Sequence, residues 1–213
     1  MKITTKKRLT SGQLKDLHTA LSKLPNPPSM LNKVIDGKPT VVMNLSEDML
    51  LSALHLSEAI SIVAKAKGLT EWIESTPEQR KAGMMGQLTV ALWLYGDWTK
   101  AFKYVTIGEG DNGDIQIGNF IINVITNSRM FTEPYENLAV IDCERFRRKP
   151  YPIYIACSRL DDNIIIWGWA KWDEVPHWDK SALDEYPPSW HTPHKNLHNL
   201  DELKETFKFQ IER

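Results

Sequence analysis

The stretch GDIQIGNFIINVITNSR, Gly113 to Arg129, decides the fold that the sequence predicts. Two short apolar runs flank the dipeptide Gly118-Asn119, which is typical of a tight hairpin turn. Side chains alternate along a strand, so Asn123 and Ile125 share one face of the second run. The stretch therefore predicts a two-stranded hairpin that begins with an acid, Asp114.

Helical patterns precede this hairpin and strand patterns follow it. Apolar residues recur every three or four positions in the predicted helices, which are residues 1–25, 46–68 and 83–96, with a short helix and a turn in 69–83. The other predicted strands are residues 38–46, 103–107, 152–160 and 163–171, and residues 200–209 fit a helix or a last strand. Helices followed by strands favour one α/β domain, residues 46–213, after an N-terminal helical extension, residues 1–45.

The composition limits the range of partners. The chain has 213 residues, 42% of them hydrophobic, which is enough to bury one good core. Its net charge is −1, so no broad cationic field attracts nucleic acid or an anionic membrane, and a nucleic-acid contact needs a local patch. Cys143 and Cys157 lack the spacing of a metal or redox site. With no signal-like N-terminus and no span-length apolar run, we expect a cytoplasmic protein with no membrane contact.

Three pieces of the chain, in their order and spacing, resemble one nuclease superfamily. The pieces are GMMGQLTVALWL, GDNGDIQIGNFIINVITNS and YPIYIACSRLDDNIIIWGWA, within residues 80–172. They resemble the helix, the acid-bearing hairpin and the following strand pair of the PD-(D/E)XK, or restriction-endonuclease-like, superfamily, above all its phage and bacterial members. The resemblance implies a restriction-endonuclease-like core with a mixed β-sheet flanked by helices, and a phage or mobile-element origin.

The resemblance also assigns the family's catalytic positions to residues of this chain. The helix glutamate that helps to hold the metal falls on Gln87, and the aspartate of the second strand falls on Asp114. The metal-binding acid of the third strand falls on Asn123, and the lysine two residues later falls on Ile125. Three of these four catalytic positions are therefore changed.

These changes remove the charge that the nuclease chemistry needs. Carboxylate charge holds Mg²⁺, and this chain keeps only one of the three carboxylates of the family pattern. Without the metal, little lowers the pKa of the attacking water or stabilises the charge on the phosphate, and Ile125 has no donor to replace the lysine. We therefore expect a catalytically inactive, nuclease-like protein without a cofactor that acts by binding. It would be a phage regulatory or anti-defence factor.

An active enzyme is the alternative. A metal-dependent DNA endonuclease would hold Mg²⁺ with Asp114 and with relocated acids, Glu109 and Asp111, in the preceding loop. Lys100 or Lys103 would then replace the missing lysine. Gly, Asn and Asp are ordinary turn residues, so the acids of this loop also have a purely structural explanation.

The strongest local basic feature lies after the hairpin. It comprises Arg129, Arg145, Arg147, Arg148 and Lys149. These side chains would contact phosphates beside the former catalytic face, although a short charged run is also typical of a solvated connection. The expected partner is nucleic acid or a host protein, and the sequence is compatible with a homodimer.

Three further features have structural explanations beside functional ones. His191, His194 and His198 would bind a metal or lie in a solvated loop, and the loop is the favoured interpretation. Trp167 and Trp169 alternate as if on one face of a strand packed on a helix. In a third interpretation of the hairpin, its former catalytic face is core: Ile121 and Ile125 pack against the Gln87 helix and Asn123 bonds to Gln87.

Overall fold

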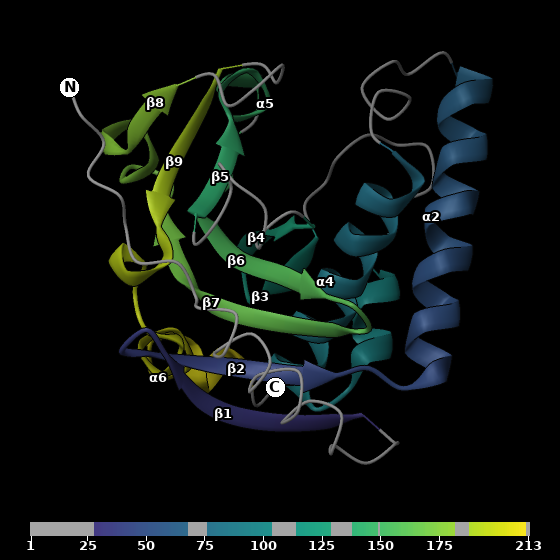
Figure 1. The fold of residues 1–213 in the computed structure, drawn as a ribbon, viewed down its shortest axis with the longest axis horizontal. Helices are drawn as coiled ribbons and strands as arrows, with labels where there is room; N and C mark the ends of the chain where they lie inside the picture. Colours follow the sequence, from purple (N-terminus) through teal and green to yellow (C-terminus); the bar gives the residue numbers. More distant parts are fainter. Residues whose placement is uncertain are drawn as a thin grey trace.

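The protein has a mixed α/β fold built on a six-stranded sheet (Figure 1). A computed structural model describes residues 28–67, 76–103, 114–128, 138–148, 150–181 and 188–211. The strand order is β1-β2-β7-β6-β4-β3. The strands are β1 (Ser29–Ile35), β2 (Lys38–Asn44), β3 (Ile115–Ile117), β4 (Phe120–Asn127), β6 (Ile153–Leu160) and β7 (Asn163–Lys171).

The sheet is mixed because one neighbouring pair is parallel. β4 runs parallel to β6, with Asn123 beside Tyr154, and the other pairs are antiparallel. The predicted hairpin is confirmed as β3 and β4, with Gly118 at φ +56° in the turn. The later strand pair, β6 and β7, is confirmed as well. A parallel neighbour requires a crossover connection, and the chain between β4 and β6 supplies it.

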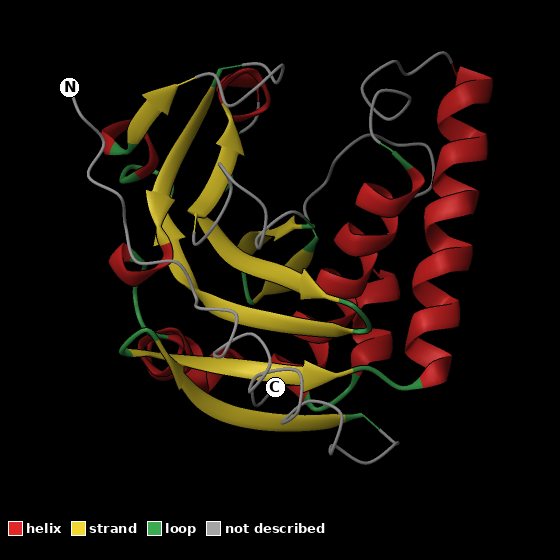
Figure 2. Ribbon diagram, viewed as in Figure 1, coloured by secondary structure: helices red, strands yellow, loops and turns green. Residues whose placement is uncertain are grey.

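A second, three-stranded sheet, which the sequence analysis did not predict, takes its first strand from that crossover (Figure 2). Its order is β5-β9-β8, and all its pairs are antiparallel. The strands are β5 (Leu138–Asp142), β8 (Asp179–Ser181) and β9 (Ser189–Pro193), and the short helix α5 (Cys143–Arg148) follows β5.

Helices cover one face of the large sheet and the small sheet covers the other. α2 (Glu47–Lys67), α4 (Pro77–Tyr95) and α6 (Leu200–Ile211) share one apolar cluster with β2, β3, β4, β6 and β7. Ile141, Phe146 and Trp190 of the small-sheet layer pack on the opposite face, against Tyr154. None of the described helices is long and apolar enough to cross a membrane. The short 3-10 helices are η1 (Trp98–Lys103), η2 (Val175–His177) and η3 (His194–Asn196).

Local signals fix the ends of the helices. Ser46 caps α2, because its Oγ accepts a hydrogen bond from the main-chain N–H of Met49 at 3.3 Å. α4 begins with a capping box between Thr76 and Gln79 and ends at Gly96 in the left-handed conformation. α4 is longer than predicted, since residues 77–83 continue it instead of forming a separate short helix and turn. Residues 200–209, for which the sequence allowed either a helix or a last strand, lie in the helix α6.

A bulge in the β6–β7 pair corrects the prediction for the two tryptophans. The register shifts between Ala156 and Cys157, and β7 takes up the extra residue next to Gly168. As a result Trp167 packs on the small-sheet side with Ile165, whereas Trp169 packs in the helix-side cluster. A strand with an inserted residue loses its strict alternation, so the two rings do not share a face.

The N-terminal part of the chain also differs from the prediction. The sequence predicted a helical extension over residues 1–45. In the structure, residues 29–44 of this segment form β1 and β2, and β2 pairs with β7. The strand predicted at 38–46 is thereby confirmed, and this segment belongs to the sheet. The helix predicted in residues 1–25 lies outside the described residues, and so does the strand predicted at 103–107 beyond Lys103.

Candidate functional site

Asp114 lies just before β3, against α4, and both of its carboxylate oxygens accept hydrogen bonds. Oδ1 accepts from the side-chain amide of Gln87 at 2.5 Å, and Oδ2 accepts from the main-chain N–H of Val124 at 2.6 Å. The main-chain N–H of Asp114 donates to the carbonyl oxygen of Ile122 at 2.9 Å. Asp114 therefore connects α4, β3 and β4.

The burial of this contact determines its physical role. Asp114 is 8% exposed and Gln87 is 9% exposed. A buried carboxylate is unfavourable unless donors compensate for lost water, and hydrogen bonds to an anion are among the stronger ones. Here one side-chain amide and one main-chain N–H supply that compensation. The arrangement stabilises the start of the hairpin against α4.

Asn123 and Ile125 lie on the other side of the sheet from Gln87. Their neighbours along β4, Ile122 and Val124, belong to the helix-side cluster, and Ile125 packs against the small-sheet cluster. Alternation along β4 gives Asn123 the same side as Ile125. Asn123 is 5% exposed, and its Nδ2 has no hydrogen-bond partner among the described residues. The structure thus brings Gln87 and Asp114 together and separates Asn123 and Ile125 from them.

The hypothesis that the hairpin face with Asn123 and Ile125 is core predicted the burial of these residues correctly, but the contacts that it predicted for them are wrong. Asn123 is buried and Ile125 is partly buried, so neither lines an open cleft. Ile121 and Ile125 pack on the small-sheet side rather than on the Gln87 helix. The amide of Gln87 bonds to Asp114, and Asn123 does not take part in that contact. The small sheet, absent from the prediction, is the reason for the difference.

The described residues do not fit a magnesium ion at these positions. Mg²⁺ needs oxygen ligands in near-octahedral geometry, but Gln87 presents its N–H₂ group to Asp114, which leaves Asp114 as the one charged ligand among these four positions. Ile125 is apolar, and Asn123 lies on the opposite face. Within the described ranges, no three His, Cys, Asp or Glu side chains are grouped to hold a metal. Glu109 and Asp111 lie outside those ranges.

The packing around Asp114 is tight. A Cβ on Gly86, the residue before Gln87, would lie 2.0 Å from Oγ1 of Thr126 on β4. Only glycine allows α4 to approach the strand this closely. Burial raises the pKa of the Cys157 thiol, and the charge of Asp114 raises it further. This cysteine is therefore a neutral core residue rather than a nucleophile.

The basic segment is held beside the face of β4 that carries Ile125. Phe146 of α5 is buried against Tyr154, with ring centroids 5.9 Å apart, and against Trp190 at 5.0 Å. Ile125 packs on the same cluster. Phe146 therefore anchors α5, and the side chain of Arg147 is exposed to solvent. Arg145 and Arg148 also lie on α5, but their side chains are not among those that the structure describes. Arg129 and Lys149 lie outside the described residues.

Of the three histidines predicted in a solvated loop, one is buried in the core and the other two are partly exposed. His191 lies on β9, and His194 at the start of η3 is 3% exposed and stacks on Trp167 with ring centroids 4.3 Å apart. Burial, together with the charge of Lys38, lowers the pKa of His194 to about 3. The ring is therefore neutral at neutral pH, and it packs as an aromatic group.

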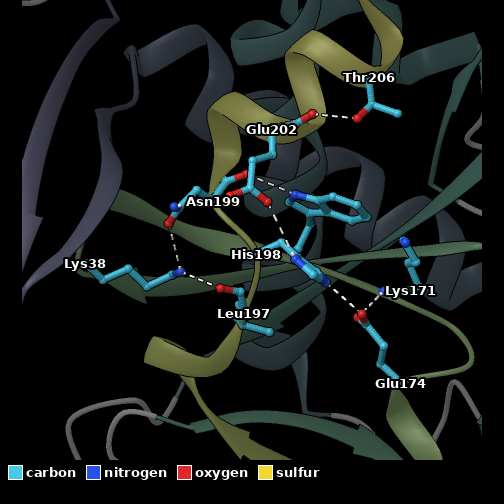
Figure 3. Close-up of polar contacts among 9 residues, drawn as sticks. Lys38, Lys171, Glu174, Leu197, His198, Asn199, Glu202 and Thr206 are labelled. Carbon is cyan, nitrogen blue, oxygen red and sulfur yellow. Dashed lines mark hydrogen bonds and ion pairs between the residues drawn. The ribbon is translucent and has the colours of Figure 1, made fainter.

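His198 takes part in a polar network that connects β7 to α6 (Figure 3). Its Nε2 lies 2.7 Å from Oε1 of Glu174, and its Nδ1 lies 3.6 Å from Oε2 of Glu202. Burial raises the pKa of Glu174, but the hydrogen bonds from His198 and from the main-chain N–H of Lys171 outweigh this and lower it. Nearby, Nζ of the buried Lys38 donates to the carbonyl oxygen of Leu197 at 2.7 Å. The network is structural and joins distant segments.

Sequence reasoning missed Gly86 as a residue that shapes the site, and it did not predict that Phe146 anchors α5. The signal for Gly86 was the pair of glycines in GMMG, since glycine inside a helix marks a close approach. Phe146 was visible as the one aromatic residue within RFRRK. No family model matches the sequence, and no match was found among curated proteins or solved structures. The geometry of the Asp114 site therefore carries the functional argument.

Proposed function

We propose that this protein is a restriction-endonuclease-like scaffold that has lost nuclease chemistry and binds nucleic acid without cutting it. The order of α4, the β3–β4 hairpin and a strand parallel to β4 supports the scaffold, because these are the pieces that carry the resemblance. A binding role fits a cytoplasmic phage or mobile-element factor that interferes with host machinery.

The observation that carries the proposal is the use of the Asp114 carboxylate. Asp114 is the one acid kept at the family's positions. Its two oxygens accept hydrogen bonds from the amide of Gln87 and from the main-chain N–H of Val124. A glutamate at position 87 would place two carboxylates in contact, which is unfavourable without a cation between them. Glutamine turns that repulsion into a hydrogen bond. The substitution at 87 thus keeps the fold and removes the metal site.

The position of α5 favours nucleic acid as the partner. Phosphate contacts come mainly from Arg and Lys, and they need no broad positive field if the cations are local. Phe146 fixes α5 beside the β4 face that carries Asn123 and Ile125, on the opposite side of the sheet from the Asp114 contact. Arg147 is exposed there, and Lys180 on β8 lies over Trp190, with its Nζ 5.9 Å from the ring centroid.

The test compares two charge reversals at opposite ends of β9. Arg147→Glu lies on α5, which contacts the start of β9 through Cys143 and Pro188, and Lys195→Glu lies in η3 after its end. We expect Arg147→Glu to weaken binding to a labelled DNA or RNA duplex about tenfold at low salt, or about 1.4 kcal/mol. The slope of log K against log salt falls by about one. Fluorescence anisotropy over a salt series measures both quantities.

The control variant separates local from general charge effects. Lys195→Glu changes the net charge equally, so it should leave the affinity within about twofold if binding is local. Equal losses in both variants would show that only overall charge matters. No salt-dependent binding by the wild type would overturn nucleic acid as the partner and leave a protein partner as the alternative.

A further inference from the structure

The outer face of α2 carries a seam of exposed residues. α2 packs on α4 through Met49 and Ala53, and it is the outermost helix of the layer (Figure 1). On its other side Leu51, His55, Glu58 and Ile62 are exposed at spacings of four, three and four residues. Such spacing produces one stripe along a helix, as in a coiled-coil seam.

The apolar residues of this seam are unusually exposed. Leu51 is 46% exposed and Ile62 is 68% exposed, and Leu54, beside the seam, is 36% exposed. Single exposed apolar residues are ordinary on a protein surface. Two at the ends of one helical stripe, with His55 and Glu58 between them, form a pattern that a partner helix can match.

The seam is complementary to itself when two copies run antiparallel. With a two-fold axis at the level of Leu56 and Ser57, Leu51 of one copy lies opposite Ile62 of the other. The same axis sets His55 opposite Glu58, so the two central pairs join a donor to a carboxylate. A two-fold interface requires this reciprocity, in which residue i meets j and j meets i.

The opposite orientation is disfavoured by the same residues. A parallel pair in register would place Glu58 opposite Glu58 and His55 opposite His55. Like charges at the centre of a seam discriminate against such a register. We propose that α2 forms the interface of an antiparallel homodimer, with the apolar contacts at its ends and the His55–Glu58 contacts at its centre.

The size of the seam sets the expected strength. One helix pair buries less than the roughly 800 Å² per partner of a standard stable interface. The dimer should therefore be weak, with a dissociation constant on the order of tens of micromolar, near −6 kcal/mol. Sedimentation of the full chain across a concentration series measures this association. The inference does not depend on the proposed binding of nucleic acid, because the readout contains none.

The decisive experiment uses two complementary charge variants. His55→Glu gives a chain with acids at 55 and 58, and the double variant His55→Lys/Glu58→Lys gives a chain with bases at both positions. We expect each chain alone to lose dimerisation at least tenfold, because its own centre repels. An equimolar mixture should form a heterodimer, since both central contacts then join opposite charges.

Only contacts between chains explain rescue by mixing. Within each chain the residues at 55 and 58 repel in the mixture as they do alone, so an effect on helix stability would persist. Glu205→Lys, on the exposed surface of α6, is the matched control and should leave the dimer unchanged. A wild type that stays monomeric up to about 1 mM overturns the proposal, and so do variants that dimerise alone or fail to pair when mixed.

Discussion

Replacing Asp114 by alanine is expected to lower the free energy of unfolding by about 3 kcal/mol, since each buried donor left without an acceptor costs roughly 1–3 kcal/mol. The substitution removes the acceptor from the side-chain amide of Gln87 and from the main-chain N–H of Val124. Both residues are buried, Gln87 on α4 and Val124 on β4. Chemical denaturation followed by tryptophan fluorescence gives the free energy of unfolding of the wild type and the variant.

Asp114→Asn is the matched control for this prediction. An asparagine oxygen still accepts from the N–H of Val124, and the amide of Gln87 can rotate so that its oxygen accepts from the new N–H₂ group. We therefore expect a loss of only about 1 kcal/mol, because two neutral hydrogen bonds replace two charge-assisted ones while a neutral side chain costs less to bury. A carboxylate kept for catalysis behaves differently, since replacing a functional acid often stabilises a protein. A gain in stability in either variant would contradict a structural role for Asp114.

The second large effect is expected at Gly86. An alanine Cβ there would lie 2.0 Å from Oγ1 of Thr126, 3.2 Å from its Cβ and 3.4 Å from Cγ1 of Val124. Overpacking a close-packed contact costs typically 1–3 kcal/mol. The higher helix propensity of alanine offsets only part of this, so we expect a net loss of about 2 kcal/mol. Thermal or chemical unfolding of Gly86→Ala measures the loss.

Two further variants show whether the clash is the cause. A Cβ on Gly83, one turn earlier in α4, would meet nothing within 4 Å. Gly83→Ala should therefore gain about 0.5–1 kcal/mol from helix propensity alone. Adding Thr126→Ala to Gly86→Ala removes the hydroxyl that the new methyl group meets, and it should recover most of the loss. Equal effects at Gly83 and Gly86 would mean that α4 does not depend on this close approach.

The elements that the sequence predicted well are those with strong local signals. The strand Phe120–Asn127 and the pair β6–β7 follow from β-branched runs on either side of short turns. α2 follows from its cap and its apolar spacing. Each of these segments contains its own evidence, because neighbouring residues determine the turn, the cap and the periodicity.

The elements that were missed depend on residues far apart in the sequence. β5 pairs with β9, and β8 is only three residues long, so no local pattern marks the small sheet. The bulge in β7 lies next to Gly168, where a Cβ would lie 2.4 Å from the carbonyl oxygen of His198. A glycine inside a strand is a recognised sign of a bulge or of a close backbone approach. The contact itself belongs to the tertiary fold.

Of the four site residues that the resemblance named, the structure brings two together and places the other two on the opposite side of the sheet. The resemblance named Gln87, Asp114, Asn123 and Ile125, and the contact between Gln87 and Asp114 joins two of them. Which face of β4 the other two occupy depends on the layer that covers it. That layer is the small sheet, so the sequence alone did not assign Asn123 and Ile125 to its side.

The central claim is that the hairpin keeps its shape without its chemistry, and a cleavage assay tests it most directly. Supercoiled plasmid and single-stranded DNA are incubated with Mg²⁺ or Mn²⁺ and with wild-type protein or Asp114→Asn, which is expected to keep the fold. We predict no metal-dependent cleavage by either protein. Cleavage by the wild type that disappears in Asp114→Asn would contradict the account, because Asp114 would then be a working catalytic acid.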